Sequence, residues 1–403
     1  MNPLRYLKEK GIRHALHVIY RYKLHGWLCR CILPFVKGRP LKDAIVIESH
    51  NDFDSNGGAL YDYLIREGYN RRYTIIWLLK NRRPAGKLPP NVHTFSLYRP
   101  GLRKAYAVCT AKYLTADNEL VEKVRPEQVS LFCDHGGVSM KSVKGLYRLP
   151  DSVDYILSPS ESYAPILASQ YEVSYPSPRF LHVGYPQHDV FWEPSENELA
   201  KLTAHSYDKV FLWMPTFRVG GGAGRRDSLA EQPFGIPLVE SEAMLQALQQ
   251  FLEKANCLLL IKIHPMQDKA TLTRLHGSDN IRILTAEAMK KLHINNYRLL
   301  KNVDALISDY SSIAYSAVLR DLPVAFVLSD MDSYTRGFSV EDLEPYLVGH
   351  RVYTFGQFLA FLQAVGQGED PYAHARRDLA RRLFTHHDGK SCQRILDALG
   401  LER

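Results

Sequence analysis

Two histidines and a pair of serines stand directly after apolar runs that are typical of buried strands. His135 follows VSLFCD (129–134), His264 follows LLLIKI (258–263), and Ser311 and Ser312 follow DALISDY (304–310). A neutral histidine accepts a proton from a hydroxyl near pH 7, and a donating histidine stabilises a departing phosphate oxygen. Two hydroxyls beside the free N–H groups of a helix's first turn attract an anion. These residue types fit the transfer of a phosphate-bearing group.

Each of these residues also has a purely structural interpretation. Ser311 or Ser312 can simply cap the helix that begins there. His135 and His264 can be hydrogen-bonded structural histidines, since the chain holds 16 histidines. The two glycines after His135 favour the chemical interpretation, because they let a backbone or a ligand approach closely. Asp134, just before it, is placed to tune the ring.

The elements that must position these residues alternate strand and helix along a chain too long for one ordinary core. A first α/β domain is expected over residues 43–200, with strands in AIVIES (44–49), YTIIWLL (73–79), AKYLTAD (111–117) and VSLFCD, followed by VDYILSPS (153–160) and FLHVGYPQHDVF (180–191). A second is expected over 201–375, with strands in KVFLWMPTF (209–217), CLLLIKIHP (257–265), NIRILT (280–285), VDALISD (303–309) and PVAFVL (323–328). Residues 376–403 are expected to form a C-terminal helix.

Two helices carry the apolar spacing that should cover these sheets. GGALYDYLIREGY turns Leu60, Tyr63 and Leu64 to one face, and AMLQALQQFLEKAN does the same with three leucines, Leu245, Leu248 and Leu252. Open parallel sheets bind ligands beyond the carboxyl ends of their strands. The unusual residues stand at such ends, so we expect a cleft between the two domains.

The basic character of the chain is concentrated in its first 42 residues. Residues 1–42 hold ten Lys or Arg and one acidic residue, a balance of +9, whereas the other 361 hold 41 basic and 42 acidic residues, a balance of −1. Apolar residues at roughly helical spacing among these cations predict an amphipathic helix on an anionic membrane surface. A basic helix that docks on its own domain is the alternative.

The same composition excludes other classes. A nucleic-acid-binding protein would carry basic patches across its body. No apolar run is long enough to span a bilayer, and no signal-peptide cleavage pattern follows the basic segment. The six cysteines are scattered without a CxxC pair, so neither a zinc site nor a disulfide framework is expected. We expect no nucleic-acid partner, no metal ligand set and no tightly bound cofactor.

Eight short motifs follow one another along the chain: HGG (135–137), SPS (158–160), VGYPQHDV (183–190), MPTFR (214–218), IKIHP (261–265), ISDYSSIAYS (307–316), RGF (336–338) and DGKSCQR (388–394). Each motif is weak alone. Their order and spacing resembles the CDP-glycerol glycerophosphotransferase family, the teichoic-acid primases and polymerases of bacterial cell walls. The resemblance runs from about Ile47 to Arg394, which is most of the chain.

The resemblance implies a GT-B fold, with two Rossmann-like domains and no DXD metal motif. The family's two functional histidines correspond to His135 and His264, the predicted catalytic pair. Its DYSS motif holds the donor diphosphate and corresponds to Asp309, Tyr310, Ser311 and Ser312. The predicted donor site also includes Thr216, Arg218 and Arg336. The predicted acceptor side consists of Asp134, Gly136 and Lys141.

Several positions depart from the family's pattern. Asp134 stands where the family has Trp, and only Lys141 approximates the lysine pair that usually follows HG. GYPRND appears as GYPQHD, with Gln187 in place of Arg, and Tyr315 and Ser316 stand in place of Phe-Asp. These changes leave the identity of the transferred polyol open.

The predicted activity is transfer of a polyol phosphate, with CDP-glycerol or CDP-ribitol as donor, to a hydroxyl of a lipid-linked saccharide or polymer. The predicted place is the cytoplasmic face of the cell membrane, held peripherally by residues 1–42. Two alternatives stay open: a nucleotide-sugar glycosyltransferase of the same fold, and a catalytically inactive scaffold for cell-surface polymer assembly.

Overall fold

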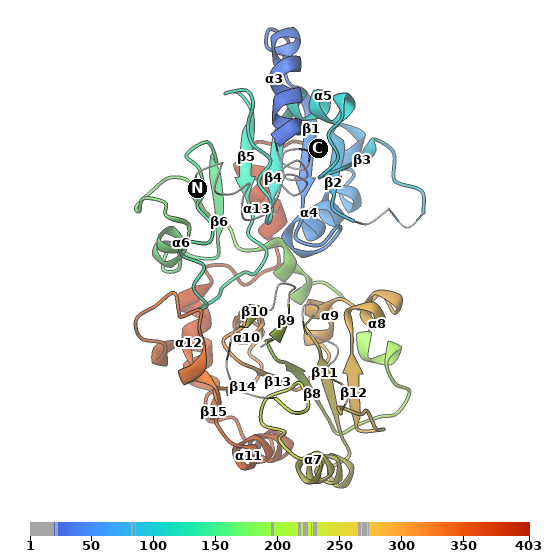
Figure 1. The fold of residues 1–403 in the computed structure, drawn as a ribbon, viewed down its shortest axis with the longest axis vertical. Helices are drawn as coiled ribbons and strands as arrows, with labels where there is room; N and C mark the ends of the chain where they lie inside the picture. Colours follow the sequence, from blue (N-terminus) through green and yellow to red (C-terminus); the bar gives the residue numbers. More distant parts are fainter. Residues whose placement is uncertain are drawn as a thin grey trace, which may run out of the picture.

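The computed structural model describes residues 20, 23–81, 84, 86–194, 197–216, 219–220, 225–226, 228, 232–264, 267, 272 and 274–403. They form two α/β domains that lie one above the other in Figure 1, each built on a parallel sheet. This confirms the predicted fold class. Most of residues 1–22 lie outside the described part, so the predicted helix there stays a prediction.

The first domain contains a seven-stranded sheet. Its strands are β1 (Lys42–Glu48), β2 (Thr74–Leu79), β3 (Val92–Ser96), β4 (Ala111–Ala116), β5 (Val129–Phe132), β6 (Tyr155–Ser158) and β7 (Phe180–His182). Their order is β3-β2-β1-β4-β5-β6-β7, and every neighbouring pair is parallel. The chain reverses direction across the sheet between β1 and β4, which makes the ends of these two strands the expected ligand site.

The second domain repeats this topology with six strands. They are β8 (Lys209–Met214), β11 (Cys257–Lys262), β12 (Ile281–Leu284), β13 (Ala305–Ser308), β14 (Val324–Val327) and β15 (His350–Val352). Their order is β12-β11-β8-β13-β14-β15, again with all pairs parallel. The switch point lies between β8 and β13. A short antiparallel pair, β9 (Val219–Gly220) with β10 (Arg225–Arg226), stands apart from this sheet.

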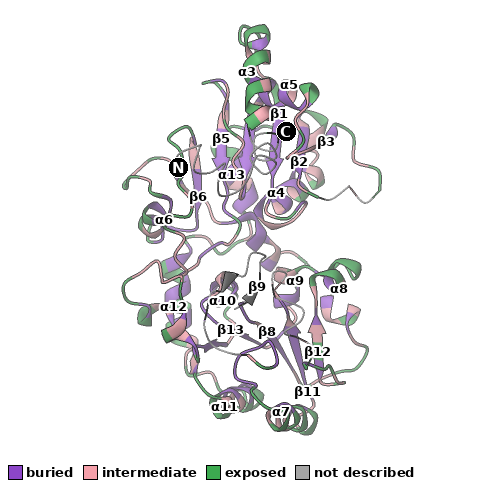
Figure 2. Ribbon diagram, viewed as in Figure 1, coloured by how far each residue is buried: buried purple, intermediate pink, exposed green. Residues whose placement is uncertain are grey.

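Helices cover both sheets, so the central strands are buried on both faces (Figure 2). The first domain has α4 (Ser55–Arg66), α5 (Leu102–Thr110) and α6 (Ala164–Tyr171). The second has α7 (Glu242–Lys254), α8 (Ala286–Lys291), α9 (Asn296–Leu300), α10 (Ser312–Leu319), α11 (Phe355–Gly366) and α12 (Ala373–Leu383). The three leucines predicted to face inward on α7 are buried, as are Leu60 and Leu64 on α4, whereas Tyr63 is half-buried.

The last helix returns to the first domain. α13 (Ser391–Ala398) packs Cys392 and Leu396 into the apolar cluster that contains Leu60 and Leu64 of α4 (Figure 1). Asp189, in the short helix η3 (Pro186–Phe191), accepts the N–H groups of Ser391 at 2.9 Å and Cys392 at 2.8 Å. A carboxylate at a helix N-terminus satisfies donors that have no partner within the helix. The GYPQHD and DGKSCQR motifs are therefore the two halves of one structural contact.

The described end of the basic segment is α3 (Leu24–Val36). One face docks on α5, where Cys29 and Val36 pack against Ala105 and Val108. Among the described residues, no helix has the length and apolar character needed to cross a membrane. The docked face agrees with the alternative interpretation of this segment, and the other face is considered below.

Candidate active site

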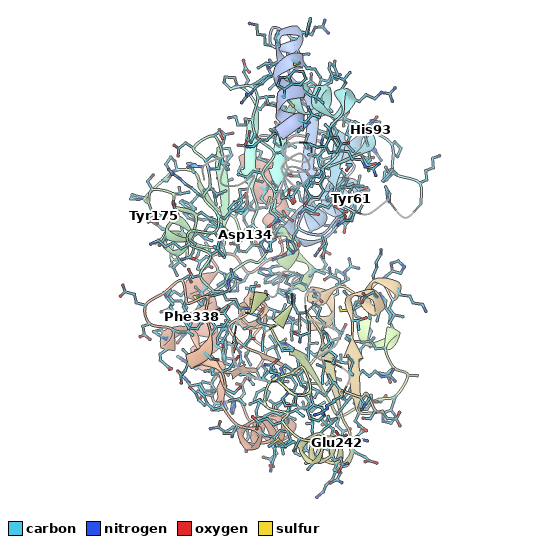
Figure 3. The ribbon with its side chains drawn as sticks, viewed as in Figure 1. Tyr61, His93, Asp134, Tyr175, Glu242 and Phe338 are labelled. Carbon is cyan, nitrogen blue, oxygen red and sulfur yellow. The ribbon has the colours of Figure 1, made fainter. Side chains whose placement is uncertain are left out.

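The turn that carries His135 is fixed from several sides. Asp134 leaves β5 with a φ of 58°, and its Oδ1 accepts the N–H of His135 at 2.6 Å and that of Gly136 at 3.4 Å. The amide of Asn56, fully buried in α4, donates to the carbonyls of Cys133 at 3.1 Å and Asp134 at 2.7 Å. Figure 3 places Asp134 where the first domain meets the second. The carboxylate thus serves mainly the backbone that presents the histidine.

The His135 ring is held as a neutral imidazole. It stacks on His50, with ring centroids 4.3 Å apart and planes 12° apart. Burial, followed by the positive charge of Lys80, lowers the pKa of His135 to about 4. The side chain is still 42% exposed, so the neighbouring groups remove water from its faces while part of its surface meets solvent. A neutral ring with an accessible nitrogen is the form that takes a proton from a hydroxyl.

The HGG loop approaches the second domain closely. A Cβ added to Gly136 would lie 3.8 Å from the hydroxyl of Ser312, at the start of α10. A Cβ added to Gly137, whose φ is 70°, would lie 3.4 Å from Nε2 of Gln187. The Gly137 contact lies within the first domain, whereas the predicted close approach at Gly136 is a contact between domains. It brings the predicted catalytic loop next to the predicted phosphate-binding helix.

The second switch point is organised around Asp309. Its carboxylate accepts the Thr216 N–H at 2.9 Å, the Thr216 hydroxyl at 2.6 Å and the Ser311 N–H at 3.1 Å. Thr216 follows β8 and Asp309 follows β13, so this cluster joins the ends of the two central strands. Asp309 is 1% exposed. Asp309 therefore links the loop after β8 to the loop after β13.

The DYSS motif divides its residues between core and surface. Tyr310 is fully buried, packs against Tyr334 and Phe338, and donates its hydroxyl to Asp330 at 3.2 Å. Its side chain is therefore not placed to touch a donor, in contrast to the prediction. Ser311 is the N-cap residue of α10, but its side chain makes no capping hydrogen bond. Simple capping therefore does not account for this serine.

Lys141 lies across the domain boundary from its own sheet. Its ammonium donates to the Thr216 hydroxyl at 2.5 Å and lies 4.0 Å from Oδ1 of Asp309. The neighbouring backbone pairs with the second domain as well, through a bridge between Lys141 and Phe338 and a hydrogen bond of 2.8 Å from Ser339 N to Met140 O. Although predicted on the acceptor side, Lys141 is positioned among the donor-side residues.

His264 follows β11 in the second domain and is half-buried. Burial, followed by the positive charges of Lys262 and Lys141, lowers its pKa to about 4. Asp309 and His50 also act on this pKa, which places His264 near both switch points. The ring is therefore neutral near pH 7 in the free protein, a form in which it acts as a hydrogen-bond donor through one N–H rather than as a cation.

Of the two arginines predicted in the donor site, the structure describes Arg336. Arg336 donates to the Ser142 carbonyl at 3.3 Å, and its charge helps to lower the pKa of His135. It thus lies near the HGG loop. Arg218 lies outside the described residues. Among the described residues, no group of three or more His, Cys, Asp or Glu side chains is arranged to hold a metal ion.

Three residues of this region were not predicted: His50, Lys80 and Asn56. Lys80 directly follows β2, and His50 comes two residues after the end of β1. Both stand after a buried strand, which is the same signal that identified His135. Asn56 had no such signal, because its task depends on a contact with residues 77 and 78 positions away.

Two departures from the family's pattern meet in space. Nε2 of His188 and the hydroxyl of Ser316 lie 2.9 Å apart, joining η3 to α10 across the domain boundary. Both residues are buried, and burial lowers the pKa of His188 to about 3. The GYPQHD and ISDYSSIAYS motifs are therefore joined by a direct contact between the two domains.

Two Rossmann-type sheets with facing switch points define a GT-B-like fold, with a histidine-bearing edge on one domain and a hydroxyl-bearing helix start on the other. The profile of the CDP-glycerol:poly(glycerophosphate) glycerophosphotransferase family matches residues 35–400. The chain belongs to this family, and it is a transferase.

The relatives support this assignment over different lengths. The ribitol-phosphate polymerase TarK of Staphylococcus aureus is 25% identical over 87% of this chain and 67% of its own length. A glycerol-phosphate primase of Bacillus spizizenii is 30% identical over 49% of this chain and 46% of its own length. A glycerol-phosphate primase of Bacillus subtilis is 21% identical over 93% of this chain and 98% of its own length.

The fold is shared with the wall teichoic acid polymerase TagF. A solved structure of a histidine-to-alanine variant of TagF superimposes with a TM-score of 0.71 at 20% identity, covering 98% of this chain and 97% of that one. Another solved structure is of a histidine-to-asparagine variant soaked with CDPG, with a TM-score of 0.68 at 19% identity.

Proposed function

We propose that this transferase moves glycerol phosphate from CDP-glycerol to a hydroxyl of a lipid-linked or glycan acceptor in teichoic-acid-type polymer synthesis. The observation that carries the proposal is the approach of Gly136, beside His135, to Ser312 at the start of α10. It puts a neutral base next to a candidate phosphate site. The family match and the CDPG-soaked TagF structure support the choice of donor.

The donor binds to the second domain in this proposal. The Ser311 and Ser312 hydroxyls and the first turn of α10 hold the diphosphate, and Lys141 and Arg336 supply positive charge. Asp309 and Thr216 fix the loops that carry these groups. Holding an anion with preformed donors stabilises charge without reorganisation during the reaction.

Transfer then needs one proton acceptor and one donor. The acceptor hydroxyl gives its proton to His135 as its oxygen attacks the β-phosphorus of CDP-glycerol. The bond from that phosphorus to the bridging oxygen breaks, and CMP leaves with the bonding electrons. His264 donates a hydrogen bond to the departing CMP oxygen. We propose that positioning and charge stabilisation supply the catalysis, with no tightly bound cofactor.

Release of nucleotide from a panel of activated donors tests the proposal. CDP-glycerol, CDP-ribitol and a UDP-sugar are each incubated with the protein and a short soluble acceptor. We expect CMP release and a phosphodiester product with CDP-glycerol, and loss of both in His135→Gln. Faster release of CMP from CDP-ribitol than from CDP-glycerol would show that ribitol phosphate, not glycerol phosphate, is the transferred group. UDP release would favour the glycosyltransferase alternative, and no release from any donor would favour a scaffold.

We also propose that the N-terminal segment holds the protein on an anionic membrane surface. α3 exposes Trp27 (59%) and Phe35 (79%) outside the face that docks on α5, and Arg30, three residues after Trp27, is exposed as well. Leu102 on the neighbouring α5 is 66% exposed. Aromatic side chains beside cations are suited to the headgroup region of a bilayer. The lipid-linked acceptor would be presented there.

Sedimentation with vesicles tests this attachment. Exchanging Trp27 and Phe35 for serine should weaken binding to phosphatidylglycerol-containing vesicles without affecting the docked face of α3. Charge reversal at Arg5, Lys8, Arg13, Arg21 and Lys23 tests the electrostatic part; of these, only Lys23 lies within the described residues. Unchanged binding of both variants would contradict membrane attachment through residues 1–42.

A further inference from the structure

We propose that His50 is a positioning residue for the transfer reaction, holding the His135 ring in its productive orientation by face-to-face stacking. The inference rests on the proposed function of His135. The two rings lie 4.3 Å apart with planes 12° from parallel. The second side-chain torsion of histidine has a broad energy profile, so a half-exposed ring keeps one orientation only if something outside it fixes its plane.

The two histidines are supported by one set of buried contacts at the β1–β4 switch point. The carboxylate of Glu48, at the end of β1, accepts the N–H groups of Asp117 at 3.1 Å and Asn118 at 2.9 Å. The carbonyl of Asp117 interacts with the His135 ring, and the side chain of Asn118 interacts with the His50 ring. Two consecutive residues, Asp117 and Asn118, therefore contact the two stacked rings, and this fixes the position of one ring relative to the other.

The loop that carries His50 is also fixed by contacts with the end of β2. Lys80 forms an ion pair of 2.5 Å with Glu48 and donates to the His50 carbonyl at 3.1 Å. Glu48 is fully buried. Asp52 accepts the N–H groups of Lys80 at 2.7 Å and Asn81 at 2.9 Å, which ties the His50 loop to the end of β2. The backbone that carries the stacking ring is therefore held in place by these contacts.

The loop after His50 is also held in a conformation that side chains disfavour. Phe53 and Ser55 have φ values of 60° and 58°. A Cβ on Gly58 would lie 2.9 Å from the Phe53 carbonyl oxygen, so only glycine allows the loop to lie this close to α4. Strained backbone of this kind persists where the surrounding structure determines it, often beside functional groups.

Stacking also bears on the charge of His135. The groups that face its ring are His50, Lys80, the Asp117 carbonyl, Asp134 and Arg336. His50 covers one face and keeps water from it, and its own pKa is lowered to about 4, chiefly by burial. Loss of the covering ring would readmit water, raise the pKa of His135 and move the acid limb of the rate profile to higher pH.

Two substitutions separate stacking from hydrogen bonding. His50→Phe keeps a flat ring and removes the nitrogens, whereas His50→Gln keeps a polar amide and removes the ring. We expect His50→Phe to keep kcat within about threefold of the parent, and His50→Gln to lose about tenfold or more, with the donor KM unchanged. His93→Gln, on β3 and away from the domain boundary (Figure 3), is the matched control.

The pKa of His135, followed by NMR in the same proteins, provides a readout that does not require turnover. It should rise in His50→Gln and stay at the parent value in His50→Phe. Parent-like kcat in His50→Gln, or an equal loss in both variants, would overturn the stacking role. If His50→Gln does not fold, the Phe variant decides alone, since a tenfold loss there contradicts stacking. A parent without turnover would count against the proposed function, while the NMR comparison would still test the stack.

Discussion

The two switch points of this protein share one sheet topology and differ in what they expose. The β1–β4 edge buries Glu48 and Asp117 and presents imidazole rings. The β8–β13 edge buries Asp309 and presents hydroxyls and a helix start. In both, a buried carboxylate accepts backbone N–H groups. The fold thus supplies the same scaffold twice, and in our proposal the residues after the strands give proton transfer to the first edge and anion binding to the second.

The largest expected effect comes from removing the imidazoles. His135→Gln and His264→Gln should each lower kcat by about 10²-fold or more, since positioned acids and bases contribute on this scale. Rates of CMP release from CDP-glycerol measure it, with His93→Gln as the control. Parent-like rates in both variants would contradict the proposed catalytic roles of His135 and His264.

The next effect concerns stability at the anion-binding edge. Asp309→Ala should lower the free energy of unfolding by about 2 kcal/mol, because it leaves the buried N–H of Thr216 without its acceptor. Thr216→Val keeps this N–H bond and removes only the hydroxyl, which contacts Asp309 and Lys141, and should cost about 1 kcal/mol. Urea unfolding compares the two. If Asp309→Ala is as stable as the parent, the carboxylate is not a scaffold, and a direct role toward the donor becomes the better explanation.

The dependence of stability on pH should reveal the contact that joins the domains. The pKa of His188 is lowered to about 3 in the folded protein, against about 6.5 when unfolded. The unfolded state therefore binds one more proton between these values, and stability falls as the pH drops through this window by about 1.4 kcal/mol per pH unit.

His188→Phe should lose the bond to Ser316 near pH 7 yet show a shallower decline in acid. The exposed His93→Phe should leave the slope unchanged. Urea unfolding at several pH values measures both slopes. An equal slope in His188→Phe and the parent would show that His188 does not stay neutral in the folded state.

The smallest expected effect is on donor affinity. Combining Ser311→Ala with Ser312→Ala should weaken CDP-glycerol binding by about fivefold while the fold stays intact, because two hydroxyl donors are lost but the N–H groups of α10 remain. Calorimetry gives the affinity and circular dichroism the fold. Unchanged affinity would show that the two serine hydroxyls do not contribute to donor binding.

The sequence was sufficient to predict the fold class, because central parallel strands are continuous apolar runs. It did not reveal β3 and β15, since VHTFS and HRV lie at sheet edges and carry polar residues. It placed His135, His264 and Ser311 at strand ends correctly. It could not show that Tyr310 points into the core or that Lys141 reaches the other domain, because both depend on packing between segments far apart in the chain.

His50 illustrates the limit most clearly. It stands at the end of a predicted strand, like His135, but nothing in ESHND shows that its ring meets another ring. The stack depends on the order β1-β4-β5, which brings the loops after β1 and β5 to the same edge. Strand order is a property of the tertiary fold, so the contact was visible only in the structure.

The separation of proton transfer from donor binding can be tested most directly by titrating CDP-glycerol into His135→Gln in a calorimeter. We predict a dissociation constant equal to that of the parent, in a protein whose turnover has fallen about 10²-fold. The base would then be independent of the donor site. A loss of affinity as large as that of the Ser311→Ala, Ser312→Ala protein would contradict this, because it would show that His135 takes part in donor binding as well.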